Sequence, residues 1–341
     1  MSTQNAQQAV SDVKLAGNHR GLNLRGWVQA VIGFSALALL VMRSNAQGLI
    51  EALRNTRVGY LPLAVAASFA VTWLMAHRWR AILAAKGLQL KTRRLFVYYL
   101  IGIFFTSFVP GGGVSGDVAR LIYVDREVRD KSLVLSTLVY ERLIGVFTLL
   151  LIGLAATLMT RAYGQGDPMI YVSEAFLALG FVVIVTLMTG YISSRLARLI
   201  RTIGRRLKIV RLAEAAARTL ELISELRRDG GLLFRTSAIS VLIRIVWSLG
   251  CYLVAWAMGL PIGLLTVFAF ISLVDLVRLM PISIGGLGVR EWAIVVLFAG
   301  LGITREQALT FSILAFAPIY ANAFVGGLLY ISGSRFRREN D

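Results

Sequence analysis

Long apolar runs that carry no charge are the feature that most limits what this chain can fold into. Several exceed 15 residues, and the 341-residue sequence is 57% hydrophobic and only 16% charged, with a mean hydropathy of +0.71. A transmembrane helix needs about 20 mostly apolar residues to cross the hydrocarbon core. The runs lack the alternation of apolar and polar residues that marks a membrane barrel. The sequence therefore predicts an all-α polytopic membrane protein.

The apolar runs divide the chain into about 7–8 transmembrane helices plus re-entrant half-helices. The expected spans are Trp27–Met42, Val58–Ala76, Lys131–Thr160, Ala175–Tyr191, Ser237–Met258, Ile262–Met280, Glu291–Gly302 and Ala308–Ser332. A kink is expected at Pro318 of the last span. His77–Arg80 follow the second span, and their aromatic ring and two arginines suit a membrane interface. Residues 1–26 are polar and read as a cytoplasmic tail without a signal peptide, residues 27–332 as the membrane domain, and residues 333–341 as a second cytoplasmic tail.

The stretch Leu95–Val109 is too short for an ordinary span. The distribution of positive charge in the flanking loops predicts how this stretch runs through the membrane. Residues 78–94 contain Lys and Arg but no acid, and residues 192–236 contain eleven Lys/Arg against four acids. The positive-inside rule places both loops in the cytoplasm, which leaves an even number of crossings between them. Leu95–Val109 should therefore enter the membrane and return, with its glycine-rich turn at membrane depth.

Each half of the chain contains a break rich in Pro and Gly. The first is SFVPGGGVSGDVARL at Ser107–Leu121, and the second is MPISIGGLGVREWA at Met280–Ala293. Pro110 and Pro281 are separated by half the length of the chain. Paired breaks in corresponding positions of two halves point to the binding site of a transporter. We expect two pseudo-symmetric halves, an inverted repeat, with the breaks facing one another.

Ionisable residues lie within the expected spans or directly beside the breaks. They are Asp117, Arg120, Glu141, Arg142, Arg244 and Asp275, with Arg278, Arg290 and Glu291 nearer an interface. Such residues are costly at membrane depth and are functional candidates by default. A structural explanation is equally open: Asp117 would pair with Arg120, Glu141 with Arg142 or Arg244, and Asp275 with Arg278.

The glycines of both breaks have a chemical use. Backbone N–H groups without neighbouring side chains can point into a cavity, and a helix that starts there favours an anion. Arginine has a planar fork that suits phosphate. The expected substrate site contains Gly111, Gly112, Gly113, Gly116, Asp117, Arg120, Glu141, Arg142, Gly285, Gly286, Gly288, Arg290 and Glu291. Close helix packing or turns would explain the glycines alone.

The net charge of +18 is spread among loops, which favours contact with anionic lipid over nucleic-acid binding. Within residues 192–236, apolar side chains from Leu196 to Val210 fall at helical spacing with arginines between them. This pattern predicts a basic amphipathic helix on the anionic inner leaflet. Packing on the protein's own cytoplasmic face is an equal alternative. A homo-oligomer is left open.

Other classes of chemistry have little support in the sequence. Cys251 is the single cysteine, and His19 and His77 do not resemble a metal pair, so no metal site is expected. PGGG is not followed by GK[ST], which argues against a nucleotide loop. No nucleophile–base motif stands out. We therefore expect no cofactor and no catalytic residue.

Three motifs together resemble the flippase-like family of the lysylphosphatidylglycerol synthase transmembrane region. They are PGGGVSGDVAR at Pro110–Arg120, VYERLIGV at Val139–Val146 and PISIGGLGVREWA at Pro281–Ala293, and RWRAIL at Arg78–Leu83 fits as well. The resemblance covers about Trp27 to Ser332. It implies movement of lipids between leaflets. The chain ends soon after the last expected span, so the soluble aminoacyltransferase domain of the resistance factors in this family is not expected here.

The sequence thus predicts a lipid flippase of the bacterial inner membrane, with both termini cytoplasmic. It would hold an anionic or phosphate-containing headgroup between the two breaks, and its partners would be membrane lipids of the phospholipid or polyprenyl-phosphate type. Three alternatives stay open: an integral-membrane transferase acting on a lipid-linked substrate, an accessory subunit of lipid synthesis, and a small-anion permease. An enzymatic role is the weaker choice.

Overall fold

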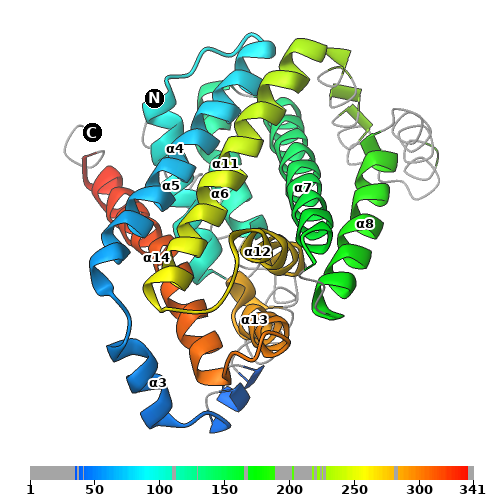
Figure 1. The fold of residues 1–341 in the computed structure, drawn as a ribbon. Helices are drawn as coiled ribbons and strands as arrows, with labels where there is room; N and C mark the ends of the chain where they lie inside the picture. Colours follow the sequence, from blue (N-terminus) through cyan, green and yellow to red (C-terminus); the bar gives the residue numbers. More distant parts are fainter. Residues whose placement is uncertain are drawn as a thin grey trace.

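The computed structural model describes residues 42–109, 113–128, 130–164, 168–188, 228–279 and 283–336, with a few single positions in 35–40 and 202–225. Every regular element within these ranges is helical (Figure 1). The all-α prediction is therefore confirmed. Most of the expected first span, the N-terminal tail, the C-terminal tail and most of the basic loop 192–236 lie outside the described residues.

Five described helices are long and apolar enough to cross a membrane. They are α4 (Leu61–Ala85), α7 (Lys131–Ala162), α8 (Pro168–Met188), α11 (Gly230–Ala257) and α14 (Arg305–Phe336). Shorter helices complete the bundle: α3 (Ala46–Arg54), α5 (Thr92–Phe108), α6 (Gly113–Val128), α12 (Leu264–Arg278) and α13 (Val289–Ala299). The protein is thus a polytopic helical bundle.

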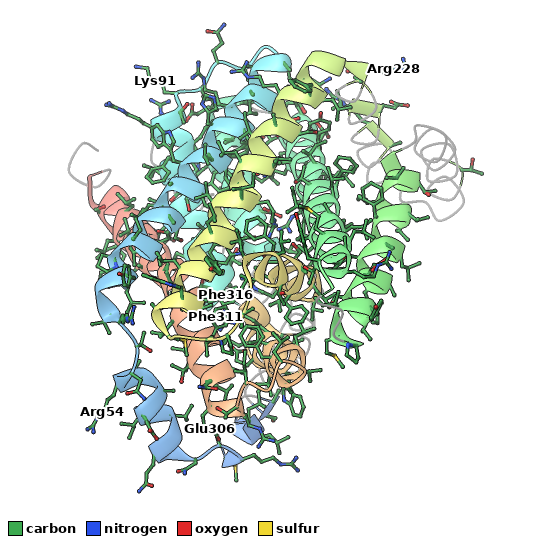
Figure 2. All side chains as sticks on the ribbon, in the orientation of Figure 1. Arg54, Lys91, Arg228, Glu306, Phe311 and Phe316 are labelled. Atoms are coloured by element: carbon green, nitrogen blue, oxygen red, sulfur yellow. The ribbon has the colours of Figure 1, made fainter. Side chains whose placement is uncertain are left out.

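The long helices run between two ends of the bundle. Lys91 and Arg228 mark one end, which we call the first end, and Arg54 and Glu306 mark the opposite, second end (Figure 2). At the first end Lys86 Nζ lies 2.6 Å from Glu225 Oε2. At the second end the start of α4 meets the end of α11, where the Arg57 N–H donates to the carbonyl of Ala257.

Helices α5 and α6 form an antiparallel hairpin whose outer ends both lie at the first end. Arg94 near the start of α5 pairs with Glu127 near the end of α6, with 3.0 Å between Nη1 and Oε2. At the inner tip, Ser115 Oγ donates to the carbonyl of Phe105 at 3.0 Å. The start of α5 and the end of α6 therefore lie at the same end of the bundle, which is the path that the sequence predicts for the re-entrant segment.

The second half contains a similar order of long and short helices, but its long helices run in the opposite direction. Helix α4 runs toward the first end and α11 runs away from it, while α7 and α14 likewise run in opposite directions (Figure 1). Between them, the α5–α6 hairpin corresponds to α12 and α13, which are joined through the short 3-10 turn η2 (Ile284–Gly286). Each half thus holds its break between two short helices, and the long helices of the second half run opposite to those in the same order of the first.

Expected boundaries and the actual ones differ most in α4. The sequence predicted a span that ends at Ala76, with His77–Arg80 as an interfacial flank. That flank is wrong, because α4 continues to Ala85 and both Arg78 and Trp79 are buried. Trp79 Nε1 donates to Thr137 Oγ1 of α7 at 3.1 Å, so the indole is part of the core.

Asn322 joins the two halves inside the bundle. Its amide Nδ2 donates to Ser68 Oγ at 3.0 Å and to Thr72 Oγ1 at 2.9 Å on α4. Because the amide is buried, we expect Asn322→Leu to lower the free energy of unfolding by about 0.5–2 kcal/mol. Reversible unfolding in detergent would measure this change. The matched control is Asn55→Ala at an exposed helix end, and equal losses for both variants would contradict the bridging role.

Candidate functional site

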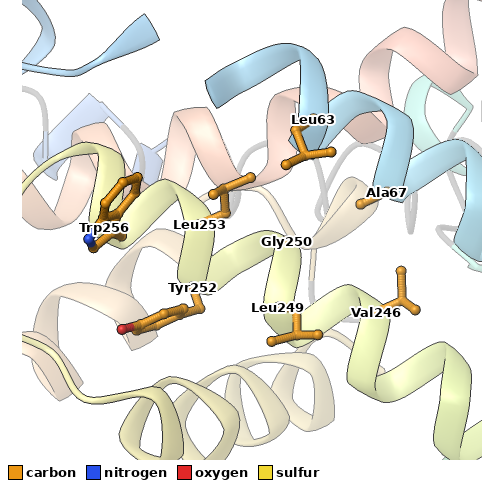
Figure 3. Close-up of a pocket in the computed structure, with 8 residues that line it drawn as sticks. All are labelled: Leu63, Ala67, Val246, Leu249, Gly250, Tyr252, Leu253 and Trp256. Atoms are coloured by element: carbon orange, nitrogen blue, oxygen red, sulfur yellow. The ribbon is translucent and has the colours of Figure 1, made fainter. Parts of the chain in front are cut away.

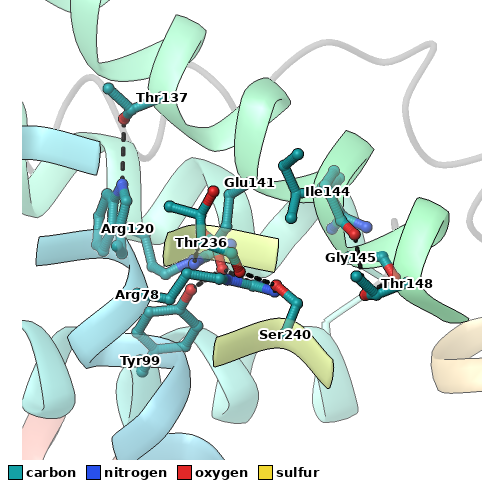
Figure 4. Close-up of polar contacts among 12 residues, drawn as sticks. Arg78, Tyr99, Arg120, Thr137, Glu141, Ile144, Gly145, Thr148, Thr236 and Ser240 are labelled. Carbon is teal, nitrogen blue, oxygen red and sulfur yellow. Dashed lines mark hydrogen bonds and ion pairs between the residues drawn. The ribbon is translucent and has the colours of Figure 1, made fainter. Parts of the chain in front are cut away.

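Five charged residues form the first cluster: Arg78, Asp117, Arg120, Glu141 and Arg142. Glu141 lies at its centre, with Arg78 Nη2 2.7 Å from Oε1 and Arg120 Nη1 3.0 Å from Oε2 (Figure 4). Asp117 accepts from Arg120 through one oxygen and from Arg142 through the other. The cluster thus connects α4, α6 and α7 at the depth of the hairpin.

Aromatic and hydroxyl groups hold the first cluster in place. The Arg120 guanidinium lies 4.2 Å from the ring centroid of Tyr99 and 5.2 Å from that of Trp79. Tyr99 donates its hydroxyl proton to Glu141, and Arg78 Nη1 donates to Ser240 Oγ at 2.7 Å (Figure 4). Since α4, α5, α7 and α11 all contribute, the guanidinium groups of Arg78 and Arg120 have little freedom to move.

The second cluster contains Arg244, Asp275, Arg278, Arg290 and Glu291. Asp275 accepts from Arg244 Nη1 at 2.5 Å and from Arg278 Nη1 at 2.9 Å. Trp247 Nε1 also donates to Asp275, at 3.0 Å. Arg290 donates to Glu291 through two nitrogens. This cluster joins α11, α12 and α13.

Phe316 of α14 lies against the arginines of the second cluster. Its ring centroid is 4.3 Å from the Arg290 guanidinium and 4.8 Å from that of Arg278. An arginine over an aromatic face is stabilised by the ring quadrupole, more so when both are shielded from water. In both clusters, therefore, contact with an aromatic ring stabilises arginines within the bundle.

The second break requires glycine at three positions. Gly285, Gly286 and Gly288 have φ values of 61°, 82° and 79°. These angles are strained for other residues. The carboxylate of Glu291 accepts the Gly288 N–H at 2.7 Å, which caps the start of α13. Sequence-predicted Glu291 thus has a visible structural role beside its pairing with Arg290.

The two breaks meet in space. A Cβ added to Gly285 would lie 3.7 Å from the carbonyl oxygen of Thr106 and 3.9 Å from Cα of Ser107. Ser107 is the first residue of the first break and Thr106 precedes it, so segments from the two halves pack against each other here. Gly111 and Gly112 lie outside the described residues.

The described glycines of the first break have different surroundings. Gly113 accepts a hydrogen bond on its carbonyl from Arg142 Nη2 at 3.0 Å, and its Cα faces that guanidinium. A Cβ on Gly116 would overlap the carbonyl of Gly102 on α5. Gly116 therefore permits close helix packing, while Gly113 lies beside the accessible part of the first cluster.

The expected partners of Glu141 were wrong, and the expected set of site residues lacked Arg78. Glu141 was expected to pair with Arg142 or Arg244, but it pairs with Arg78 and Arg120. Arg78 is not among the predicted site residues, because the sequence predicts an interfacial flank for His77–Arg80. The signal that could have found it is helical spacing, since Val71, Arg78 and Ile82 share one buried face of α4. The predicted pairs Asp117–Arg120 and Asp275–Arg278 are present.

The arginines differ strongly in their exposure. The side chain of Arg142 is 44% exposed and that of Arg278 is 23% exposed, whereas those of Arg120 and Arg290 are 9% and 4% exposed. In the first cluster Arg142 is the only exposed arginine, whereas in the second both Arg278 and Arg244, the latter 15% exposed, are partly exposed. Arg142 and Arg278 are the cations of the two clusters that a ligand can reach most easily.

An apolar groove of about 400 Å³ lies between α4 and α11, nearer the second end (Figure 3). It is lined by Leu63, Ala67, Val246, Leu249, Gly250, Tyr252, Leu253 and Trp256. Small residues open it, since a Cβ on Gly250 would lie only 3.6 Å from that of Ala67. At its rim the Arg57 guanidinium lies 5.7 Å from the Trp256 ring centroid. This arrangement suits an acyl chain at a membrane interface.

Comparison with known proteins agrees with this architecture. The family model described as the lysylphosphatidylglycerol synthase TM region matches residues 26–326. The chain is 23% identical over 296 residues to a UPF0104 membrane protein of Methanothermobacter thermautotrophicus, which covers 82% of this chain and 87% of that protein. It is 27% identical over 129 residues to the UPF0104 membrane protein MJ1595 of Methanocaldococcus jannaschii, which covers 36% and 38% of the two chains. No solved structure matches the chain.

Proposed function

Because the chain belongs to the family of the lysylphosphatidylglycerol synthase transmembrane region, we propose that it is a lipid translocator. It would move a lipid with an anionic or phosphate-containing headgroup between the two leaflets. The observation that supports this most is the meeting of the two glycine-broken segments, each of which lies beside an arginine cluster. Substrate sites of transporters with inverted repeats lie at such broken helices.

In this proposal the outer arginines make the first contacts with the phosphate. Arg142 and Arg278 are the most exposed arginines of their clusters, and each packs against a glycine of its break, Gly113 or Gly286. Arg120 and Arg290 lie behind them and add positive potential from within the bundle. The carboxylates orient the arginines. The acyl chains remain in the lipid and enter from the side, for which the groove between α4 and α11 offers an apolar surface.

We place the first end in the cytoplasm. It holds Lys86, Lys91, Arg94 and Arg228, and the basic segment between α8 and α11 joins helices that end and begin there. The positive-inside rule and the attraction of Lys and Arg to anionic lipids both favour this orientation. The membrane would be the bacterial inner membrane, with both termini cytoplasmic.

A leaflet-translocation assay tests the proposal. Purified protein would be reconstituted into vesicles that contain phosphatidylglycerol with a fluorescent acyl chain, and movement would be followed by quenching from outside. An arginine–phosphate hydrogen bond contributes about 1.5–3 kcal/mol. The double variant Arg142→Ala/Arg278→Ala is therefore expected to slow movement by about tenfold or more.

The fold should survive this double substitution. Asp117 keeps its bond to Arg120, and Asp275 keeps its bonds to Arg244 and Trp247. The matched control is Arg94→Ala/Arg161→Ala, which removes two paired but exposed arginines at the bundle ends. Equal rates for the wild type and the Arg142/Arg278 variant would overturn the assignment of these residues. Absence of movement in folded wild-type protein would overturn the proposed function.

A further inference from the structure

We infer that the groove between α4 and α11, together with the rim at its outer end, is a second lipid-binding site, separate from the two charged clusters. It holds an anionic glycerophospholipid of the leaflet at the second end. One acyl chain lies in the groove, and the phosphate contacts Arg57 and Trp256 at the rim. Because binding at the surface of the bundle needs no translocation, this inference stands independently of the proposed function.

The groove is long and narrow. Its lining on α11 runs from Val246 to Trp256, which is about 15 Å at the rise of an α-helix. A volume of about 400 Å³ over this length gives a mean cross-section of about 27 Å². A helix with its side chains is about 10 Å wide and so has roughly three times that cross-section. The groove is therefore too narrow for a helix of another protein and suits a single acyl chain.

The walls of the groove are apolar and open toward the lipid. Leu63 of α4 and Leu249 of α11 are both exposed, and aliphatic side chains from the two helices surround the space (Figure 3). Gly250 and Ala67 lie where the helices come closest, and their small size leaves the space open. Lipid tails are as apolar as leucine, so packing holds a chain in the membrane, and a groove offers more contacts than a flat surface.

A cation and two aromatic rings form the rim of the groove. The Arg57 guanidinium lies over the Trp256 ring, and the Tyr60 ring meets the same indole edge-on with 4.7 Å between ring centroids. The Arg57 N–H donates to the carbonyl of Ala257, which fixes the backbone of Arg57 at the end of α11. Trp and Tyr are enriched where a membrane meets water. The rim is therefore suited to headgroup level, with the groove reaching into the hydrocarbon.

The charge at the rim favours an anionic headgroup. Arg57 is exposed, and no ion pair among the described residues involves it. Residues 43–60 contain three arginines and one glutamate, a net charge of +2. In the proposed orientation this end faces away from the cytoplasm, where the positive-inside rule does not account for such an excess. The planar fork of an arginine suits a lipid phosphate.

The rim lies too far from the clusters for one phosphate to reach both. On α11, Arg244 of the second cluster is 12 residues from Trp256, which is about 18 Å along the helix. On α4, Arg78 of the first cluster is 15 residues beyond Leu63, or about 22 Å. A headgroup bound at Arg57 therefore leaves both clusters free.

Thermal unfolding of the purified protein in detergent tests the site. Phosphatidylglycerol serves as the anionic probe and phosphatidylcholine as the zwitterionic one, each titrated into the same micelles. A ligand that binds only the folded state raises the melting temperature. We expect phosphatidylglycerol to raise it by about 3 °C or more beyond the effect of phosphatidylcholine at equal mole fraction. Equal shifts for the two lipids would overturn the anionic headgroup.

Two variants separate the headgroup contact from the chain contact. Arg57→Gln should move the midpoint of the phosphatidylglycerol titration about fivefold to higher lipid, the share of one exposed ion pair. Its matched control is Arg54→Gln, because Arg54 is exposed at the same end but does not lie over the Trp256 ring. Gly250→Leu fills the groove and should remove the shift by either lipid. Its control is Ala66→Leu, at an exposed position of α4 outside the groove.

The remaining outcomes distinguish this site from the clusters and from a protein partner. Arg142→Ala/Arg278→Ala should keep the selective shift, since the rim is unchanged. If that variant loses the shift while Arg57→Gln keeps it, the lipid binds at the clusters and the inference is overturned. A wild-type dimer, seen by native mass spectrometry and lost in Gly250→Leu, would assign the groove to a second copy instead. No readout here involves transport, so absence of translocation would overturn the proposed function and leave this site intact.

Discussion

Replacement of Glu141 by glutamine is expected to destabilise the protein by about 3–5 kcal/mol, the range measured when one partner of a buried ion pair is removed. Glu141 is 4% exposed and is the carboxylate that both Arg78 and Arg120 contact. Glutamine keeps the shape but not the charge. Two buried guanidinium groups would then lie close together with Asp117 as their nearest acid. Repulsion between them adds to the loss of the ion pairs.

The loss should appear as a large fall in the melting temperature of the purified protein in detergent. Glu127→Gln is the matched control, because Glu127 also pairs with an arginine and a tyrosine but lies at the end of the α5–α6 hairpin. Exposed pairs contribute at most about 1 kcal/mol. If the two variants melt at the same temperature, Glu141 does not organise the first cluster as described.

Replacement of Gly326 by alanine is expected to separate α14 from α5 and to destabilise the bundle by about 3 kcal/mol. A Cβ at this position would overlap the main-chain carbonyl of Leu100, which cannot rotate away. Alanine is intrinsically the better helix former by up to about 1 kcal/mol, so the expected sign comes from packing alone. The α5–α14 contact also positions the inner end of α5, where the first break begins.

Gly327→Ala is the matched control for this prediction. The added methyl group at Gly327 would meet the ring of Phe104, 2.9 Å away, and that side chain can shift. We therefore expect a loss below about 1 kcal/mol, partly offset by helix propensity. Unfolding by a chemical denaturant in detergent would compare the two variants. Similar stabilities would show that α5 and α14 can move apart without loss.

The two clusters show how the bundle tolerates ten charged side chains. Each is built from an acid and an arginine one helical turn apart, Asp117–Arg120 on α6 and Asp275–Arg278 on α12, to which other helices add further arginines. Each pair within a helix partly neutralises the charge of that helix. The additional arginines come from other helices and connect those helices to it. The pair on α6 follows the glycines of the first break, whereas the pair on α12 precedes those of the second, so the two clusters resemble one another in composition and not helix by helix.

The sequence by itself determined the all-α membrane class, the re-entrant hairpin and the two halves with their breaks. These features follow from the length of apolar runs, from the distribution of Lys and Arg and from Pro and Gly, all of which act locally along the chain. The local pairs Asp117–Arg120 and Asp275–Arg278 could be predicted for the same reason. Predicted boundaries were least accurate in α4, where two buried cationic and aromatic residues resembled an interfacial flank.

Only the tertiary structure decided which arginines are buried and which are accessible. Arg78 is 63 residues from Glu141 and 162 residues from Ser240, and no local pattern specifies such partners. Which arginines contact Glu141 depends on how α4, α7 and α11 are rotated about their axes. If α4 were rotated by one residue, the Arg78 side chain would point away from Glu141. Helix packing sets that rotation through contacts such as the hydrogen bond from Trp79 of α4 to Thr137 of α7 and the close approach of Gly250 on α11 to Ala67 on α4. For this reason the outer pair, Arg142 and Arg278, could be recognised only once the helices were placed together.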